Sequence, residues 1–171
     1  MKHTVNTAGI INDSIADGPG IRLVVFCQGC PRRCPGCHNE GALEFGAGID
    51  TDTDEIIEMF SKNPLLDGIT FSGGEPFCQA EALVNIAEAA AKKNLDIVTF
   101  TGYVYEELIE MAEKDQWIKR LLDCTDLLID GPYEEENRDL TLRFRGSSNQ
   151  RIIDVKKAKN QGFPVLAEKY M

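Results

Sequence analysis

Apolar residues along the chain fall in short runs that alternate between strand-like and helix-like spacing. Mostly apolar stretches typical of buried strands cover residues 21–27, 68–71, 96–100 and 126–129. Apolar residues at helical spacing cover about 52–64, 79–93, 104–122 and 151–160. This alternation predicts right-handed crossovers and a mainly parallel sheet.

Local signals mark where the helices begin and end. Asp52 and Glu55 form a capping-box pattern at the start of the first helix, and Pro64 marks its end. The third helical stretch is expected to break near Asp115. Gly162 is expected to stop the last helix.

The C-terminal third is harder to assign to elements. Residues 133–150 are polar and are interpreted as a long loop. Ser148 or Asn149 is expected to cap the last helix, and residues 163–167 are expected to add an edge strand.

A chain of 171 residues is long enough for one domain with a substantial core. Four or five strand–helix units are too few to close an eight-fold barrel. We therefore expect an α/β fold, a partial and open (β/α) barrel, as a single domain over residues 1–171. Parallel sheets of this kind place their sites at the carboxyl ends of the strands, so the turns there are expected to form one composite site.

Composition and charge restrict the kinds of partner and the cellular compartment that we expect. The net charge of −10 argues against nucleic acid or an anionic membrane as the main partner. The longest apolar run, Leu23 to Cys27, is too short to span a bilayer, and the N-terminus has no signal-peptide core. A cytoplasmic protein with reduced cysteines is expected.

The cysteines carry the strongest chemical signal. Cys30, Cys34 and Cys37 form a CxxxCxxC motif on a Gly- and Pro-rich loop after the first predicted strand. A fully protein-ligated cubane iron–sulfur cluster needs four cysteines, so three would leave one iron open for a ligand. A zinc site completed by Cys27 or His38, or a redox-active Cys-x-x-Cys pair, is the alternative. The spacing favours iron–sulfur.

The remaining cysteines and the other turns admit ordinary structural interpretations. Cys27, Cys78 and Cys124 are expected to be structural. The turn Gly73-Gly74-Glu75 between a strand and a helix would suit the end groups of an amino acid, although Gly-Gly turns are common. Arg32 and Arg33 are either solvated or offset the thiolate charge. Arg143, Arg145 and Arg151 flank a polar loop that either caps the last helix or docks a protein or phosphate.

Taken together, these motifs resemble the radical S-adenosylmethionine superfamily. Asp17-Gly-Pro-Gly-Ile-Arg22 and Cys37-His38-Asn39 resemble the glycyl-radical-enzyme activases within it. Three further segments are similar to the subfamily that activates anaerobic ribonucleoside-triphosphate reductase: Thr101 to Leu108, Asp126 to Tyr133, and Arg145-Gly-Ser-Ser-Asn-Gln-Arg151. The resemblance covers roughly residues 8–155.

This resemblance implies a role for each matching position. Cys30, Cys34 and Cys37 would bind a [4Fe–4S] cluster whose open iron chelates S-adenosylmethionine. Residues expected around that cofactor are Gly36, Cys37, His38, Gly73, Gly74, Glu75, Thr101 and Asp130. A 5′-deoxyadenosyl radical would then create a glycyl radical on the reductase large subunit, with reduced flavodoxin or a similar protein as electron donor.

Two departures from the family pattern affect the cofactor contacts. Many superfamily members have an aromatic residue before the last cysteine, where this chain has Gly36, and His38 could supply the ring instead. Gly131-Pro132 follows Asp130 where some related activases have a lysine. The alternatives are an activase of another glycyl-radical enzyme, such as pyruvate formate-lyase, and a non-catalytic zinc-binding module.

Overall fold

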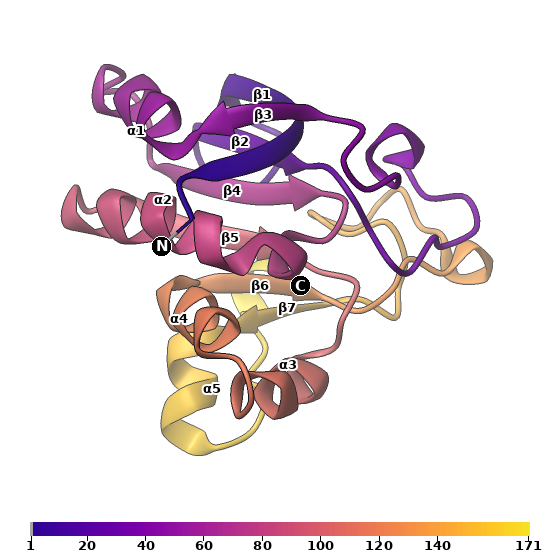
Figure 1. The fold of residues 1–171 in the computed structure, drawn as a ribbon. Helices are drawn as coiled ribbons and strands as arrows, with labels where there is room; N and C mark the ends of the chain where they lie inside the picture. The colour runs from indigo at the N-terminus through magenta and orange to yellow at the C-terminus, as the bar shows by residue number, and fades with distance from the viewer. Residues whose placement is uncertain (1) are drawn as a thin grey trace.

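One seven-stranded sheet organises residues 2–171, the part of the chain that this computed structural model describes (Figure 1). The strand order is β3-β1-β2-β4-β5-β6-β7. The strands are β1 (Thr4–Ser14), β2 (Arg22–Cys27), β3 (Ile49–Asp52), β4 (Gly68–Gly73), β5 (Asp96–Phe100), β6 (Leu127–Asp130) and β7 (Arg151–Asp154).

The four central strands are parallel, and the outer pairings are antiparallel. β2, β4, β5 and β6 pair in register from Arg22↔Gly68 through Phe100↔Ile129. β1 pairs antiparallel with β2 and β3, and β7 pairs antiparallel with β6. The parallel centre of the sheet, with a helix before each next strand, confirms the predicted partial (β/α) architecture.

Helices cover one face of this sheet. They are α1 (Thr53–Ser61), α2 (Ala80–Lys92), α3 (Tyr105–Ala112), α4 (Gln116–Cys124) and α5 (Val155–Gln161). The main core joins these helices to the strands, and α2 contributes Leu83, Val84, Ile86, Ala87 and Ala90 to it. Burying a side chain such as Leu83 stabilises the fold by about 1.5–3 kcal/mol. A smaller cluster of Val98, Ile129 and Ile152 lies apart from that core.

Most of the predicted helix boundaries are confirmed. The Asp52 side chain accepts from the Asp54 N–H at 2.8 Å and caps α1. The predicted break at Asp115 is confirmed, because its carboxylate caps α4 by accepting from Trp117 and Ile118. Gly162 ends α5 with a left-handed φ of 82°, as predicted.

Three strands were not predicted, and one predicted helix starts late. β1 and β3 are polar and form the antiparallel side of the sheet, so neither has the continuous apolar run of a central strand. The helix expected over 151–160 is wrong in its first turn, where β7 pairs with β6 instead. Asp154 caps α5, so neither Ser148 nor Asn149 does. The strand expected at 163–167 is reduced to one bridge between Ile153 and Leu166.

The loops that matter for function lie at one edge of the sheet. The loop after β2 and the irregular segment after β6 project from the side toward which the β4 arrow points (Figure 1). The segment over 133–150 contains one short 3-10 turn, Glu135–Asn137, and a bridge between Arg138 and Ser147, and is otherwise irregular as expected.

Candidate functional site

The carboxyl ends of the parallel strands enclose one cavity of about 390 Å³. Its size falls within the range of ordinary ligand pockets. Residues from all four parallel strand ends line it, which confirms the expected composite site: Cys30, Cys34, Cys37, Gly73, Gly74, Thr101, Gly102 and Gly131.

The three motif cysteines are free thiols that open onto this cavity. Cys30 is 9% exposed, while Cys34 and Cys37 are half-buried. Burial raises the pKa of the Cys30 thiol, and the backbone N–H groups of Arg32 and Arg33 oppose this by donating to its sulfur. The Asn39 N–H lies 3.4 Å from the Cys37 sulfur. Amide donors of this kind stabilise thiolate ligands and tune the potential of an iron–sulfur centre.

Cys27 does not join this group. It is fully buried in β2 and belongs to the main core, and burial raises the pKa of its thiol far above the usual range. The expectation of a structural Cys27 is confirmed. Within the described residues 2–171, no group of three or more His, Cys, Asp or Glu side chains is arranged to hold a single metal ion.

The donor set fits an anionic iron–sulfur cluster. Three thiols face one cavity, and Arg32 and Arg145 line the same space as cations. The Arg32 Nε is buried without a hydrogen-bond partner among the described residues, so one donor remains for an anionic group. Cys30, Cys34 and Cys37 would hold three irons of a cubane and leave the fourth without a protein ligand.

The two glycines after β4 are required by close backbone approach. Gly73 has a φ of 92°, and a Cβ there would lie 2.5 Å from the backbone N and O of Cys27. A Cβ on Gly74 would lie 2.3 Å from the carbonyl oxygen of Gly29. These glycines let β4 pack against the start of the cysteine loop, while both also line the cavity. Their contact with a cofactor stays a prediction.

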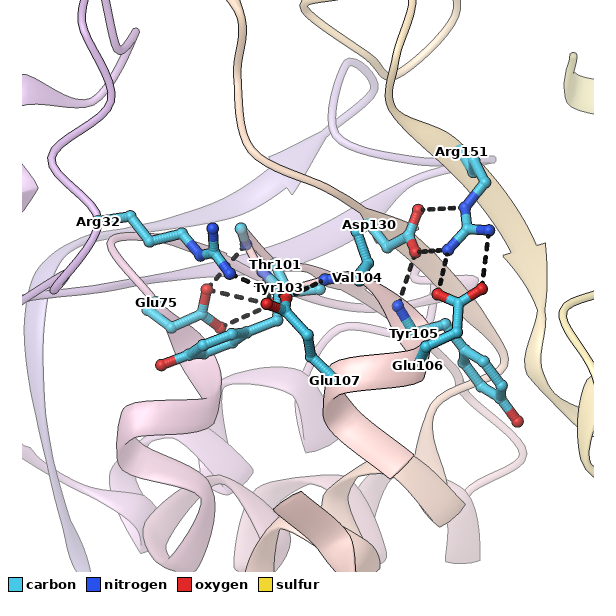
Figure 2. Close-up of polar contacts among 11 residues, drawn as sticks. Arg32, Glu75, Thr101, Tyr103, Val104, Tyr105, Glu106, Glu107, Asp130 and Arg151 are labelled. Atoms are coloured by element: carbon cyan, nitrogen blue, oxygen red, sulfur yellow. Dashed lines mark hydrogen bonds and ion pairs between the residues drawn. The ribbon is translucent and has the colours of Figure 1, made fainter. Parts of the chain in front are cut away.

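Glu75 lies behind the cavity rather than in its lining. Its carboxylate is fully buried and accepts from the Thr101 hydroxyl at 2.9 and 3.0 Å and from the Gly102 N–H at 2.8 Å (Figure 2). Burial raises the pKa of Glu75 to about 7, although hydrogen bonds from Gly102, Phe77 and Thr101 oppose that rise. Glu75 therefore ties the turn after β4 to the turn after β5 and sets the position of Thr101, which does line the cavity.

Asp130 is also occupied by contacts within the protein. It is 1% exposed, accepts from the Tyr105 N–H at 2.8 Å, and accepts from Arg151 at 3.0 and 2.5 Å (Figure 2). Asp130 does not line the cavity. Its carboxylate holds the start of α3 and pairs with β7. A direct contact with a cofactor stays a prediction for Asp130, as it does for Glu75.

Gly36 and His38, on either side of Cys37, lie differently relative to the cavity. Gly36 lies outside the cavity lining, with a φ of 74°, and a Cβ there would come within 2.9 Å of the Glu135 carboxyl group. His38 lines the cavity, and its ring centroid lies 5.0 Å from that of Tyr133. Tyr133 lines the cavity too and was not singled out by the sequence. His38 and Tyr133 together offer aromatic surface where Gly36 has none.

Sequence reasoning also left Arg32 and the loop over 143–151 unassigned. Arg145, Gly146 and Gln150 line the cavity, which places that loop at the site rather than at a remote surface. Cys78 is exposed, and Cys124 is half-buried as the last residue of α4. Among the described residues, no helix has the length and apolarity needed to cross a membrane.

Comparisons with known proteins agree with this geometry. Residues 16–153 match the family described as 4Fe–4S single cluster domain. The anaerobic ribonucleoside-triphosphate reductase-activating protein of Haemophilus influenzae is 33% identical over 81% of this chain and 90% of its own length. That of Escherichia coli is 30% identical over 81% and 91%.

The alignment with pyruvate formate-lyase-activating enzymes covers a smaller share of those proteins. The one from Listeria monocytogenes is 32% identical over 89% of this chain but only 60% of itself. The chain belongs to the 4Fe–4S single cluster domain family and, within it, to the radical S-adenosylmethionine activating proteins that its cysteine spacing resembles.

Proposed function

We propose that this chain binds a [4Fe–4S] cluster and S-adenosylmethionine and generates a glycyl radical on anaerobic ribonucleoside-triphosphate reductase. The observation that carries the proposal is the meeting of Cys30, Cys34 and Cys37 with the Gly73-Gly74 turn at one cavity. Three thiolates supply a cluster with an open position, and the cavity beside it offers room for a ligand.

Cys30, Cys34 and Cys37 would hold a cluster that, once reduced by the electron donor, would supply the single electron needed to cleave S-adenosylmethionine and so start hydrogen abstraction from a glycine Cα of the partner. The protein's own residues hold and enclose these groups. Cys30, Cys34 and Cys37 are the cluster ligands. Gly73, Gly74, Thr101 and His38 line the cavity and are the proposed cofactor contacts. Glu75 holds Thr101 from behind, and Asp130 holds the start of α3.

The reductase is favoured over pyruvate formate-lyase as partner by the extent of the match. The chain aligns with 90% of a reductase-activating protein but with 60% of a formate-lyase-activating enzyme.

We also propose a cytoplasmic location and a protein electron donor. All six cysteines, which lie in the described part of the chain, are free thiols, as expected in the reducing cytoplasm. The charge of −10 supports a protein partner rather than nucleic acid or an anionic membrane. Reduced flavodoxin, or a protein of the same kind, is the proposed electron donor.

Anaerobic reconstitution tests the proposal. The wild-type protein, reduced without oxygen, should bind iron and sulfide, form 5′-deoxyadenosine, and raise an organic radical signal on the reductase. Cys30→Ala should lose the cluster, whereas the core variant Cys27→Ala should keep it. Zinc in place of iron and sulfide would establish the binding-module alternative. A radical signal on pyruvate formate-lyase, and none on the reductase, would reassign the partner.

A further inference from the structure

Arg32 links the cysteine loop to the start of α3. It lies between Cys30 and Cys34 in sequence, and its Nη2 donates to Glu107 Oε2 at 2.9 Å (Figure 2). Its guanidinium lies over the Tyr103 ring, 4.7 Å from the centroid. The Arg32 side chain is 26% exposed, so it is largely withdrawn from solvent. A single side chain therefore joins the loop to two residues at the end of β5 and the beginning of α3.

The absence of a side chain at Gly102 leaves room for the Arg32 side chain. A Cβ added at Gly102 would lie 2.6 Å from Arg32 Cδ, so a residue larger than glycine would displace the side chain. Arg32 also lowers the pKa of Glu75, against the larger effect of burial, which places its charge near that carboxylate. Glu75 in turn holds Thr101 and Gly102.

The backbone at Arg32 contacts a proposed cluster ligand directly. The N–H groups of Arg32 and Arg33 donate to the Cys30 sulfur, and Arg33 has a φ of 47°. Successive N–H groups of a turn that point toward one atom form a concave anion site. Fixing the Arg32 side chain on α3 therefore also fixes the two amides that face Cys30.

We propose that Arg32 is a positioning residue that clamps the cysteine loop onto the first turn of α3, and so holds Cys30 in place for a cofactor. Arg33 has no such role, because its side chain is exposed and, within residues 2–171, the ion pair to α3 is made by Arg32 and not by Arg33. The inference rests on the proposed function for its link to the cofactor. The contacts that form the clamp are made within this chain and require no cofactor.

Thiol alkylation of the cofactor-free protein tests the clamp. Arg32→Ala should speed alkylation of Cys30, followed by peptide mass spectrometry, by about tenfold, the factor that corresponds to about 1.4 kcal/mol. Arg33→Ala removes the same charge from the same loop and should stay within about twofold of wild type. Cys27, buried in the core, should remain unreactive in both variants and reports global unfolding.

Glu107→Gln separates the clamp from the charge. Glutamine can still accept from the Val104 N–H that Glu107 now binds at 2.8 Å, but it gives up the ion pair with Arg32. Cys30 should become more reactive in this variant, by less than in Arg32→Ala. Equal Cys30 rates in Arg32→Ala and Arg33→Ala would overturn the proposal, as would a matching rise at Cys27.

Kinetics of the reconstituted protein distinguish positioning from simple destabilisation. A loosened loop must be ordered when the cofactor binds, so Arg32→Ala should raise the KM for S-adenosylmethionine by about tenfold and leave kcat within about threefold. Arg32→Lys should recover only part of this, because an ammonium cannot both stack on Tyr103 and pair through a planar fork. A lower kcat at unchanged KM would refute the positioning role. Alkylation requires neither cofactor nor reductase, so it is independent of the proposed activity.

Discussion

Arg22 Nη2 lies 2.6 Å from Asp96 Oδ1 at the edge of the sheet opposite the cavity. The Arg22 side chain is fully buried and also donates to the Thr70 hydroxyl and to the carbonyls of Pro19 and Ile69. This one guanidinium joins the turn before β2 to β4 and β5. It explains structurally why an arginine follows the Asp-Gly-Pro-Gly turn.

Arg22→Met should lower the free energy of unfolding by about 3 kcal/mol, because several buried acceptors lose their donor at about 1 kcal/mol each. Asp96→Asn should cost less than about 1 kcal/mol, since solvent screens a half-exposed partner. The Asp96 side chain is 53% exposed, and Arg22 keeps its other acceptors in that variant. Urea denaturation of both variants measures the difference, and equal losses would contradict this account.

Gly73 is expected to tolerate no side chain. Its φ of 92° and the 2.5 Å distance from an added Cβ to the Cys27 backbone both oppose alanine. Gly73→Ala should cost more than about 3 kcal/mol or prevent folding. Gly41 is the matched control, because a Cβ there meets nothing within 4 Å. Gly41→Ala should fold with stability within about 0.5 kcal/mol of wild type. Comparable stability of the two variants in denaturant would show that close packing is not why Gly73 is glycine.

The strands and turns that sequence alone could predict share one property: their signal is local. The runs that became β2, β4, β5 and β6 are apolar because most residues of these central strands are buried, whichever way their side chains point. The cysteine motif is likewise readable from spacing. β7 was mistaken for helix, because Ile152, Ile153 and Val155 fit either period until β6 supplies a pairing partner.

The roles of buried polar residues could not be predicted in the same way. Glu75 lies just after β4 and Asp130 is the last residue of β6. The family resemblance implies a contact with the cofactor for both. Their actual partners, Thr101 and Arg151, are 26 and 21 residues away in sequence. Only the folded arrangement shows that these carboxylates are already occupied.

Glu75 should make stability depend on pH in the cofactor-free chain. Burial raises its pKa from 4.5 to about 7. Between these values the folded chain holds more protons than the unfolded chain, so the free energy of unfolding should fall as pH rises from about 4.5 to about 7. The Glu75 contribution is of the order of 3 kcal/mol.

Denaturant titrations across that pH range measure this dependence. Glu75→Gln should remove the Glu75 part of the slope, whatever it does to stability at a single pH. Glu55→Gln, at an exposed position on α1, should retain the wild-type slope. A Glu75→Gln variant whose pH dependence is indistinguishable from wild type would exclude an elevated pKa at this site.

Variants of Asp130 and its partner Arg151 distinguish a structural role of Asp130 from a role in cofactor binding. Arg151 is held by Asp130 and Glu106, and its pKa is raised above the usual range by both carboxylates. Arg151→Met leaves the 1% exposed Asp130 with only the Tyr105 N–H and should cost about 3 kcal/mol. Glu106→Gln should cost less than about 1 kcal/mol, because the Glu106 side chain is 54% exposed.

Asp130→Asn completes the comparison. If Asp130 serves to hold α3 and β7, this variant should lose stability in urea yet bind S-adenosylmethionine within about threefold of wild type, because a group that does not touch the ligand contributes to its affinity only through the fold. Affinity is measured on reconstituted protein from the change in the cluster spectrum. Binding weakened by about tenfold in a variant that remains folded would instead place Asp130 against the cofactor.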